Sequence, residues 1–561
     1  MIFLRSTVVF FLLLGMMLKS YSQSAQISLK FRYGNEVNPI GIDVKYTLST
    51  DFSNSTERLV FLYDKMYPLQ RSSDTVSNLQ VRDRLGLFPL KLQASDKLNS
   101  SGFLKWSALR AQDGPVTVSY FVPLAPRIAL RSGPVKDLQA AGDGMSGAIG
   151  SFLLFPDQSK KINITLHWIL NNGQEAVCSQ GFGKNISFQT SLDDLFEIQF
   201  LAGSLYANAN NKITTGFNMY GLGKEVNNEL STSADWYSKA YKTIRDSLNG
   251  SPTAPFYYFF RSYNGSPMSS GRASYGSFMV YLPKKMSIND EDIKILSAHE
   301  MIHVFVSDLV DPDDLTDWYV EGIADYLSVK LLYDGHLIDE KKYLEVINDH
   351  AAVYYTNKLR NIPNQKIPEI MWSGTNAWTT PYSRGAMYFA DLEGKLKQHK
   401  AKLAVLSLVN ILDAMKKRGE KITSDSWANL LEKEVGTWAL ADYKNMLSGK
   451  LLIPADNAFG ERFERKPVKA SFFDLGFDYP KSIKAGEHIK NLRANSPAAK
   501  AGLKAGDIIN NDVDLLPLYK SYSKSLTIAV RRNGKIIPIT YHPRSTSASA
   551  YKWTAINQVT Q

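Results

Sequence analysis

The pentapeptide His299-Glu300-Met301-Ile302-His303 constrains this chain more than any other stretch. It lies in a run from 287 to 306 that predicts a helix, with a capping box formed by Ser287 and Asp290 at its start. Residues four apart share one face of a helix, so both histidine rings can reach a single metal ion. A zinc ion held in this way keeps an open position for water, and Glu300 is placed to take the proton of that water.

A second helical run, from 318 to 326, supplies the remaining ligand. Glu321 can close the tetrahedron around the ion, and Asp325 lies one turn further along the same helix face. Asp325 can therefore accept the free N–H of a liganding histidine and orient its ring. The alternative is a buried pair of helices whose histidine and glutamate side chains only hydrogen-bond each other. Because ligands and base are all present, we expect one zinc ion per chain.

These ligands and this base resemble those of the gluzincins, the thermolysin-like zinc metallopeptidases. The resemblance implies that Glu300 acts as general base and then as general acid. It also implies that the strand-like run just before the zinc helix forms the edge of the active site, where substrate backbone adds on as a further strand. The residues concerned are Ser277, Phe278 and Met279.

Another segment resembles the tyrosine-x-(Lys/Arg)-glycine sequence of gluzincin aminopeptidases. It runs from Tyr382 to Gly385 and follows a loop rich in Trp and Thr. The resemblance implies that Tyr382 donates a hydrogen bond to the oxyanion of the tetrahedral intermediate. Arg384 is expected to be structural, or to give electrostatic support at the cleft.

The chain before the zinc helix divides into an export signal and a β-rich region. Residues 1 to 22 carry Arg5, a short apolar run and small residues before the expected cleavage after Ser22, which is typical of a secretory signal peptide. We therefore expect an exported protein, periplasmic or extracellular, that associates with a membrane only if this segment stays uncleaved. Residues 23 to 191 alternate apolar and polar over short runs and predict an all-β sandwich.

Residues 192 to 452 mix buried strands with long helical runs. They predict a thermolysin-like α+β catalytic domain that ends in a helical lobe. The acidic stretch from 307 to 317 lacks the order of a calcium loop, so a solvated connector is favoured. Cys178 is the only cysteine, so no disulfide forms within the chain, and we expect a buried inert thiol.

The C-terminal part resembles a PDZ domain over residues 468 to 545, after a linker at 453 to 467 and before a tail at 546 to 561. The resemblance rests on the stretch 494 to 509 and on a loop whose backbone N–H groups would cradle a peptide carboxylate. That loop consists of Leu475, Gly476 and Phe477, and Asn533-Gly534 predicts a later hairpin. Binding of a peptide C-terminus and simple packing on the catalytic domain both remain open.

The order of a β-rich region, a gluzincin core and a PDZ-like unit resembles the glycyl aminopeptidase family. The family usually has a Glu-His pair before the edge strand to hold a substrate α-amino group, but Ala273 and Ser274 stand there in this chain. Phe305 replaces a usual tryptophan. We therefore expect a zinc metallopeptidase acting on peptides or proteins, with aminopeptidase and endopeptidase action both open.

Charge and motif content limit the remaining classes of function. Residues 455 to 561 contain 17 Lys and Arg against 9 Asp and Glu, giving +8 of the total net charge of +11. This balance suits anionic partners, but no nucleic-acid-binding motif accompanies it, so nucleic acid is excluded as a partner. A non-catalytic PDZ-containing binding protein with a structural zinc is the other alternative. It gives no reason for the chain to hold Glu300, which is not a ligand.

Overall fold

The computed structural model describes the chain between Gln23 and Ile556 with internal gaps. The described ranges are 23–34, 38–48, 58–64, 76–93, 103–124, 137–207, 216–223, 226–250, 255–263, 269–283, 286–311, 315–371, 373–479 and 482–556. The expected signal peptide and part of the acidic connector lie outside these ranges. Across the described ranges, no helix is both long and apolar enough to cross a membrane.

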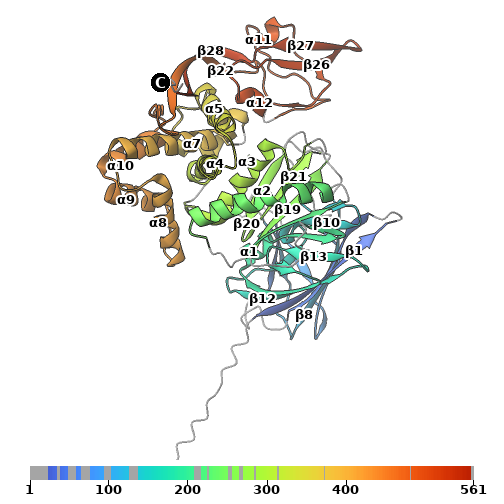
Figure 1. Ribbon diagram of the computed structural model, residues 1–561. Coiled ribbons are helices and arrows are strands. Elements are labelled where there is room, and N and C mark those ends of the chain that lie inside the picture. The colour runs from blue at the N-terminus through green and yellow to red at the C-terminus, as the bar shows by residue number, and fades with distance from the viewer. Residues whose placement is uncertain are drawn as a thin grey trace, which may run out of the picture.

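The N-terminal region is built from β-sheets, as expected, and occupies the lower part of Figure 1. A seven-stranded sheet has the order β15-β12-β1-β2-β8-β4-β5, a four-stranded sheet the order β11-β3-β7-β6 and a five-stranded sheet the order β14-β13-β16-β10-β9. Buried and outward positions alternate along β1, β8 and β12, so each strand gives one face to a shared apolar core.

The strands of this region have the following bounds: β1 Ser24–Tyr33, β2 Pro39–Leu48, β3 Val60–Asp64, β4 Ser77–Asp83, β5 Gly86–Leu87, β6 Leu90–Leu92, β7 Phe103–Ala108, β8 Val116–Pro123, β9 Gln139–Ala141, β10 Gly144–Ala148, β11 Leu154–Pro156, β12 Ile162–Ile169, β13 Glu175–Cys178, β14 Gly181–Phe182, β15 Asn185–Thr190 and β16 Gln199–Gly203. Helix α1 spans Leu192–Glu197. Cys178 is buried at the end of β13, and burial raises the pKa of its thiol to about 12, in agreement with an inert cysteine.

A mixed five-stranded sheet of order β17-β18-β19-β21-β20 lies between the N-terminal region and the zinc helix. Its members are β17 Leu205–Ala207, β18 Phe217–Leu222, β19 Phe256–Tyr263, β20 Ser270–Ser274 and β21 Ser277–Pro283. The three inner strands run parallel, and β20 pairs antiparallel at one edge. Successive side chains of β19 point to opposite faces, so Tyr257 and Phe259 pack toward the N-terminal region while Tyr258 and Phe260 pack toward the helices.

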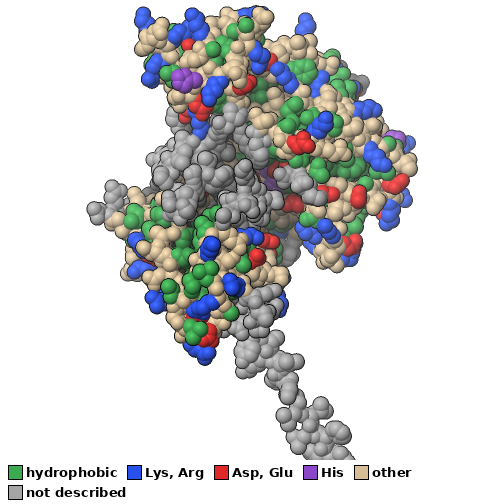
Figure 2. Space-filling model, turned by 180° about the vertical axis from the view of Figure 1, so that it is seen from behind, with side chains coloured by type: hydrophobic (Ala, Val, Ile, Leu, Met, Phe, Trp, Pro, Cys, Tyr) green, Lys and Arg blue, Asp and Glu red, His purple; other side chains and the backbone are tan. Residues whose placement is uncertain are grey.

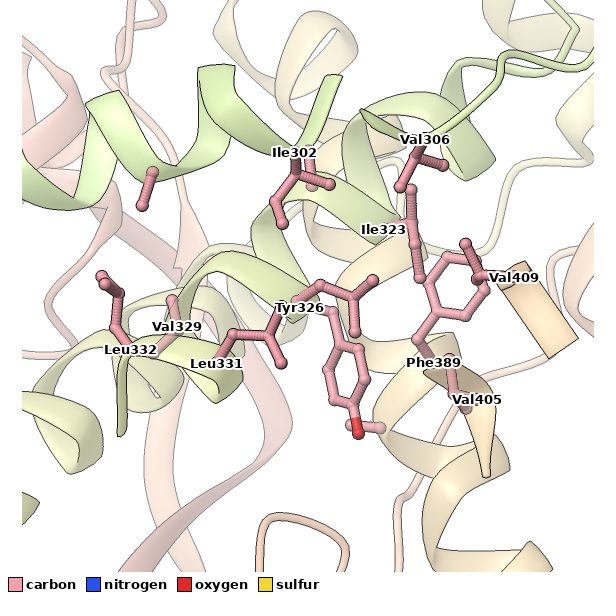
Figure 3. Close-up of a cluster of buried hydrophobic side chains, with 14 of the residues drawn as sticks. Ile302, Val306, Ile323, Tyr326, Val329, Leu331, Leu332, Phe389, Val405 and Val409 are labelled. Atoms are coloured by element: carbon pink, nitrogen blue, oxygen red, sulfur yellow. The ribbon is translucent and has the colours of Figure 1, made fainter. Parts of the chain in front are cut away.

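Most of the helices lie in the central region of the chain, between the mixed sheet and the C-terminal unit. They are α2 Val226–Ser247, α3 Glu291–Phe305, α4 Asp317–Asp334, α5 Glu340–Thr356, α6 Ile367–Ile370, α7 Thr375–Gln398, α8 Val405–Lys417, α9 Ser424–Glu434 and α10 Thr437–Leu447. Apolar side chains of α3, α4, α7 and α8 meet in one core, where Ile302, Ile323, Phe389 and Val409 lie close together (Figure 3). The last three helices, α8, α9 and α10, form the expected helical lobe and pack their buried side chains into the same core.

The C-terminal unit is a β-rich region that joins the helical region through a long ribbon. Strand β22 (Phe463–Phe473) pairs with β28 (Arg544–Ala555), and β24 (Ile508–Ile509), β26 (Leu526–Arg532) and β27 (Lys535–Tyr541) form a small sheet. The remaining elements are β23 Ser482–Ile483, β25 Val513–Asp514, α11 Pro497–Lys500 and α12 Leu516–Tyr519. Asn533 and Gly534 make the predicted hairpin turn, both with positive φ. Lys and Arg side chains are scattered over the face of this unit that Figure 2 shows.

The zinc helix starts later than the sequence pattern predicts. Helix α3 begins at Glu291, because the residues from Ser287 to Asp290 form a separate turn before it. Asp290 accepts a hydrogen bond from the Ser287 backbone N–H, but the Ser287 hydroxyl bonds to Asn289 N–H instead of completing the capping box. The two histidines still lie on helical backbone, so their spacing on one face is unaffected.

Candidate active site

Three side chains converge at the crossing of α3 and α4. Nε2 of His299 and Nε2 of His303 lie 3.2 Å and 3.3 Å from Oε2 of Glu321, and 3.0 Å from each other. One ligand atom from each of the three residues lies within 4.8 Å of the other two. Two imidazole nitrogens and a carboxylate oxygen are a donor set that suits zinc, and they leave a position for water. The structure thus brings together the three residues that the sequence predicts as ligands.

The pKa of His299 is raised and the pKa of Glu321 is lowered, and both shifts indicate that the carboxylates of the site stabilise a positive charge between them. Burial would lower the pKa of His299, but its contacts with Asp325 and Glu321 raise it well above the usual range. Burial would raise the pKa of Glu321, yet the two histidines hold it far below the usual value. A divalent cation satisfies the same carboxylate and leaves both imidazoles neutral, as ligands must be.

Asp325 takes the position that the sequence predicts for it. Its Oδ1 lies 2.8 Å from Nδ1 of His299, the ring nitrogen that faces away from the ligand cluster. A carboxylate at this nitrogen fixes the tautomer and the plane of the ring, so Nε2 is directed at the ion.

Glu300 lies beside the ligands and is buried. Burial raises the pKa of its carboxyl group, and the two histidines oppose that shift. Gly271 of β20 makes room for this side chain: a Cβ at Gly271 would lie 2.5 Å from Oε1 of Glu300. No spacing in the sequence indicates this contact, because β20 joins the site only through its pairing with β21.

Tyr382 lies on α7 and faces the ligands from a third direction. Its ring stacks at 6.2 Å from the His299 ring and meets Trp378 edge-on at 5.8 Å. Burial raises the pKa of its phenol well above the usual value, and the charges of Glu321 and Asp325 raise it further. Tyr382 therefore keeps its proton at physiological pH and can act as a hydrogen-bond donor.

Arg384 has a structural role. Its guanidinium is buried and donates to the backbone carbonyl oxygens of Arg360 and Ile362, at 3.2 Å and 2.7 Å. These bonds hold the turn that follows α5 against the middle of α7. Of the two roles expected for Arg384, the structure shows this one.

The prediction for the edge strand is wrong by one strand. Ser277, Phe278 and Met279 lie in β21, which pairs with β19 on one side and β20 on the other. The exposed edge of the sheet beside Glu300 is therefore β20. The sequence does not predict this strand, because Ser270–Ser274 is short, consists mainly of small and polar residues and lacks an apolar pattern.

The loop of Leu475, Gly476 and Phe477 adjoins a carboxylate from its own chain. Oδ1 of Asp474 accepts a hydrogen bond of 2.9 Å from the Gly476 backbone N–H and also pairs with Arg493. Oδ2 lies 2.6 Å from Nζ of Lys358, just beyond α5. Leu475 and Phe477 are buried in the apolar core of the unit.

Solved structures of zinc metallopeptidases share this fold. An aminopeptidase N family protein from Idiomarina loihiensis matches with a TM-score of 0.69 at 15% sequence identity, over 95% of this chain and 98% of that chain. An M1 zinc metallopeptidase mutant from Deinococcus radiodurans, bound to a Tyr-Ser-Ala substrate, matches with a TM-score of 0.50 at 15% identity, over 77% of this chain and 95% of that chain. No protein-family model and no curated protein matches the sequence. The chain thus has the fold of the aminopeptidase N family protein from Idiomarina loihiensis, and it brings together a His-His-Glu group that could hold a metal ion.

Proposed function

We propose that this protein is a zinc-dependent peptidase. The observation that carries the proposal is the convergence of His299, His303 and Glu321, with Glu300 buried beside them as a carboxylate that is not a ligand. Bound zinc would act as a Lewis acid and make water a stronger nucleophile at neutral pH. A site built only to hold a structural ion would have no need of Glu300.

Glu300 performs the proton transfers in this proposal. It accepts a proton from water as the oxygen attacks the carbonyl carbon of the peptide bond. It then gives that proton to the amide nitrogen as the C–N bond breaks. The burial that raises the pKa of Glu300 assists the first step, because the carboxylate is then a stronger base and its protonated form is less costly to form.

Tyr382 supports the negative charge that develops on the carbonyl oxygen. Its O–H remains protonated and is held in place by stacking on His299 and by Trp378. A donor that is fixed before the reaction stabilises the developing charge without reorganisation.

The substrate binds as an additional strand along β20. In the β20–β21 hairpin, Ser274 pairs with Ser277 across the turn. Hydrogen-bonded and non-hydrogen-bonded pairs alternate from there, so the backbone N–H and C=O groups of Gly271 and Ala273 point away from β21, toward the outer edge of the sheet. An extended peptide that pairs there runs directly past Glu300, because Gly271 touches that side chain.

The aminopeptidase and endopeptidase versions of this proposal differ in what binds the substrate N-terminus. The aminopeptidase version is supported by the shared fold with the aminopeptidase N family protein. The endopeptidase version is favoured by β20 itself, which carries Arg272, Ala273 and Ser274 and no carboxylate that could hold an α-ammonium group. Peptides of one sequence with free and with acetylated N-termini separate the two, since only an endopeptidase cleaves the acetylated peptide at a comparable rate.

Two further parts of the proposal rest on the sequence. The apolar segment at residues 8 to 18 supports export to the periplasm or the cell exterior. The PDZ-like character of the C-terminal unit rests on residues 494 to 509. The Gly476 N–H already donates to the Asp474 carboxylate of the same chain. This contact favours packing of the C-terminal unit on the catalytic region over binding of a free peptide C-terminus at this loop.

A further inference from the structure

A histidine outside the ligand set extends the contacts of the zinc helix. His350 lies on α5, and its Nδ1 is 3.4 Å from Oδ2 of Asp325. The other oxygen of Asp325 is 2.8 Å from Nδ1 of His299. The two oxygens of one partly buried carboxylate therefore face one histidine each, and the contacts run from His350 through Asp325 to His299.

The chemistry of His350 suits the role of a neutral donor. Burial lowers its pKa, and nearby Lys520 and His299 act in the same direction against the opposing effect of Asp325. A neutral ring has one N–H, and with the proton on Nδ1 that N–H is on the nitrogen that lies 3.4 Å from Asp325. With a ring nitrogen close to each of its oxygens, the Asp325 carboxylate is restricted in rotation, and this restricts the plane in which it meets His299.

The helix that carries His350 is fixed by the C-terminal ribbon. Asn348 exchanges two hydrogen bonds with the backbone of Trp553 in β28, at 2.9 Å and 2.7 Å. Val353 packs into the apolar core of the C-terminal unit with Phe473. Helix α5 is therefore docked on the C-terminal unit through Asn348 and Val353, and the same helix carries His350 to the Asp325 carboxylate.

We propose that His350 is a positioning residue that acts through Asp325 on His299 and so sets the affinity of the site for zinc. This inference rests on the zinc site of the proposed function. Partners beyond the ligand shell orient the ligands, and their loss typically lowers metal affinity 10- to 100-fold. Because His350 is one contact further from the ion, we expect an effect of about 10-fold, at the low end of this range.

The test is zinc affinity by chelator competition on the full chain, with thermal unfolding of the metal-free form as a control for folding. His350→Leu removes the N–H and should raise the zinc dissociation constant about 10-fold. His350→Asn keeps a donor near the position of Nδ1 and should stay within about threefold of wild type. His488→Leu, at an exposed histidine of the C-terminal unit, is the matched control and should leave the affinity unchanged.

The outcomes separate this inference from the proposed function. If the wild type binds one zinc and folded His350→Leu binds it equally well, the inference is overturned and the peptidase proposal stands. If the wild type binds no zinc, both are overturned. Should His350→Leu fail to fold, His350→Gln replaces it. Weaker zinc binding in His350→Gln than in His350→Asn supports the inference, and wild-type affinity in both overturns it.

Discussion

Gly322 and Gly385 lie in direct backbone contact where α4 crosses α7: a Cβ on Gly322 would come within 2.3 Å of the Gly385 Cα atom. Gly322 follows the ligand Glu321, and Gly385 lies about one turn after Tyr382. The close crossing therefore sets how far the phenol of one helix stands from the carboxylate of the other.

Replacing Gly385 with alanine should move these helices apart. The new methyl group would meet the Trp318 carbonyl oxygen at 1.9 Å, a contact that only backbone displacement can relieve. We expect a loss of about 1 to 3 kcal/mol in the free energy of unfolding, together with reduced turnover. Denaturant unfolding and peptide cleavage measure the two effects. Gly216→Ala is the control, because a Cβ there meets no atom within 4 Å. A Gly385→Ala variant as stable and active as Gly216→Ala would contradict this account.

Removing the phenol hydroxyl of Tyr382 should lower kcat and leave the zinc content unchanged. Tyr382→Phe keeps the stacking on His299 but takes away the hydrogen-bond donor, so we expect kcat to fall about 100- to 1,000-fold with zinc content unchanged. Tyr333→Phe, which keeps its stacking on Tyr343 away from the ligands, should retain wild-type turnover. An unchanged kcat in Tyr382→Phe would remove this residue from the mechanism.

The pH dependence of stability has an identifiable contribution from Asp349 on α5. Burial raises its pKa to about 6, although Lys520 lies 3.6 Å away. The folded state therefore holds this proton more tightly than the unfolded chain, and its contribution to stability is present below about pH 4 and is lost as the pH rises through about 6. Asp349→Asn should raise the free energy of unfolding at pH 7 by about 1 to 3 kcal/mol and flatten its fall between pH 4 and 6. A lower stability of Asp349→Asn at pH 7 would show that the pair with Lys520 outweighs burial.

The ligand cluster was predictable because its geometry is local. His299 and His303 share a helix, Glu321 and Asp325 share the next, and helical periodicity alone places each pair on one face. The role of Tyr382 could be predicted only from a family resemblance, since a tyrosine on a helix does not by itself indicate an active-site residue. Its position depends on the close crossing at Gly385.

The wall of the site was not predictable from local patterns. Gly271 on β20 contacts the base Glu300, and His350 on α5 contacts Asp325, each across a stretch of sequence that gives no local pattern. The apolar run of β21 indicated a strand at the site. Its neighbour β20 is too short and too polar to be recognised as a strand from the sequence. The sequence therefore placed the edge of the sheet at β21, although the edge strand is β20.

The central claim is that Glu300 performs proton transfer beside a zinc site that it does not help to form. The most direct test measures zinc content and peptide cleavage of Glu300→Gln next to wild type and His299→Ala. We predict one zinc per chain with cleavage abolished in Glu300→Gln, and loss of both zinc and cleavage in His299→Ala. Glu300→Gln that cleaves peptides at the wild-type rate would contradict the account.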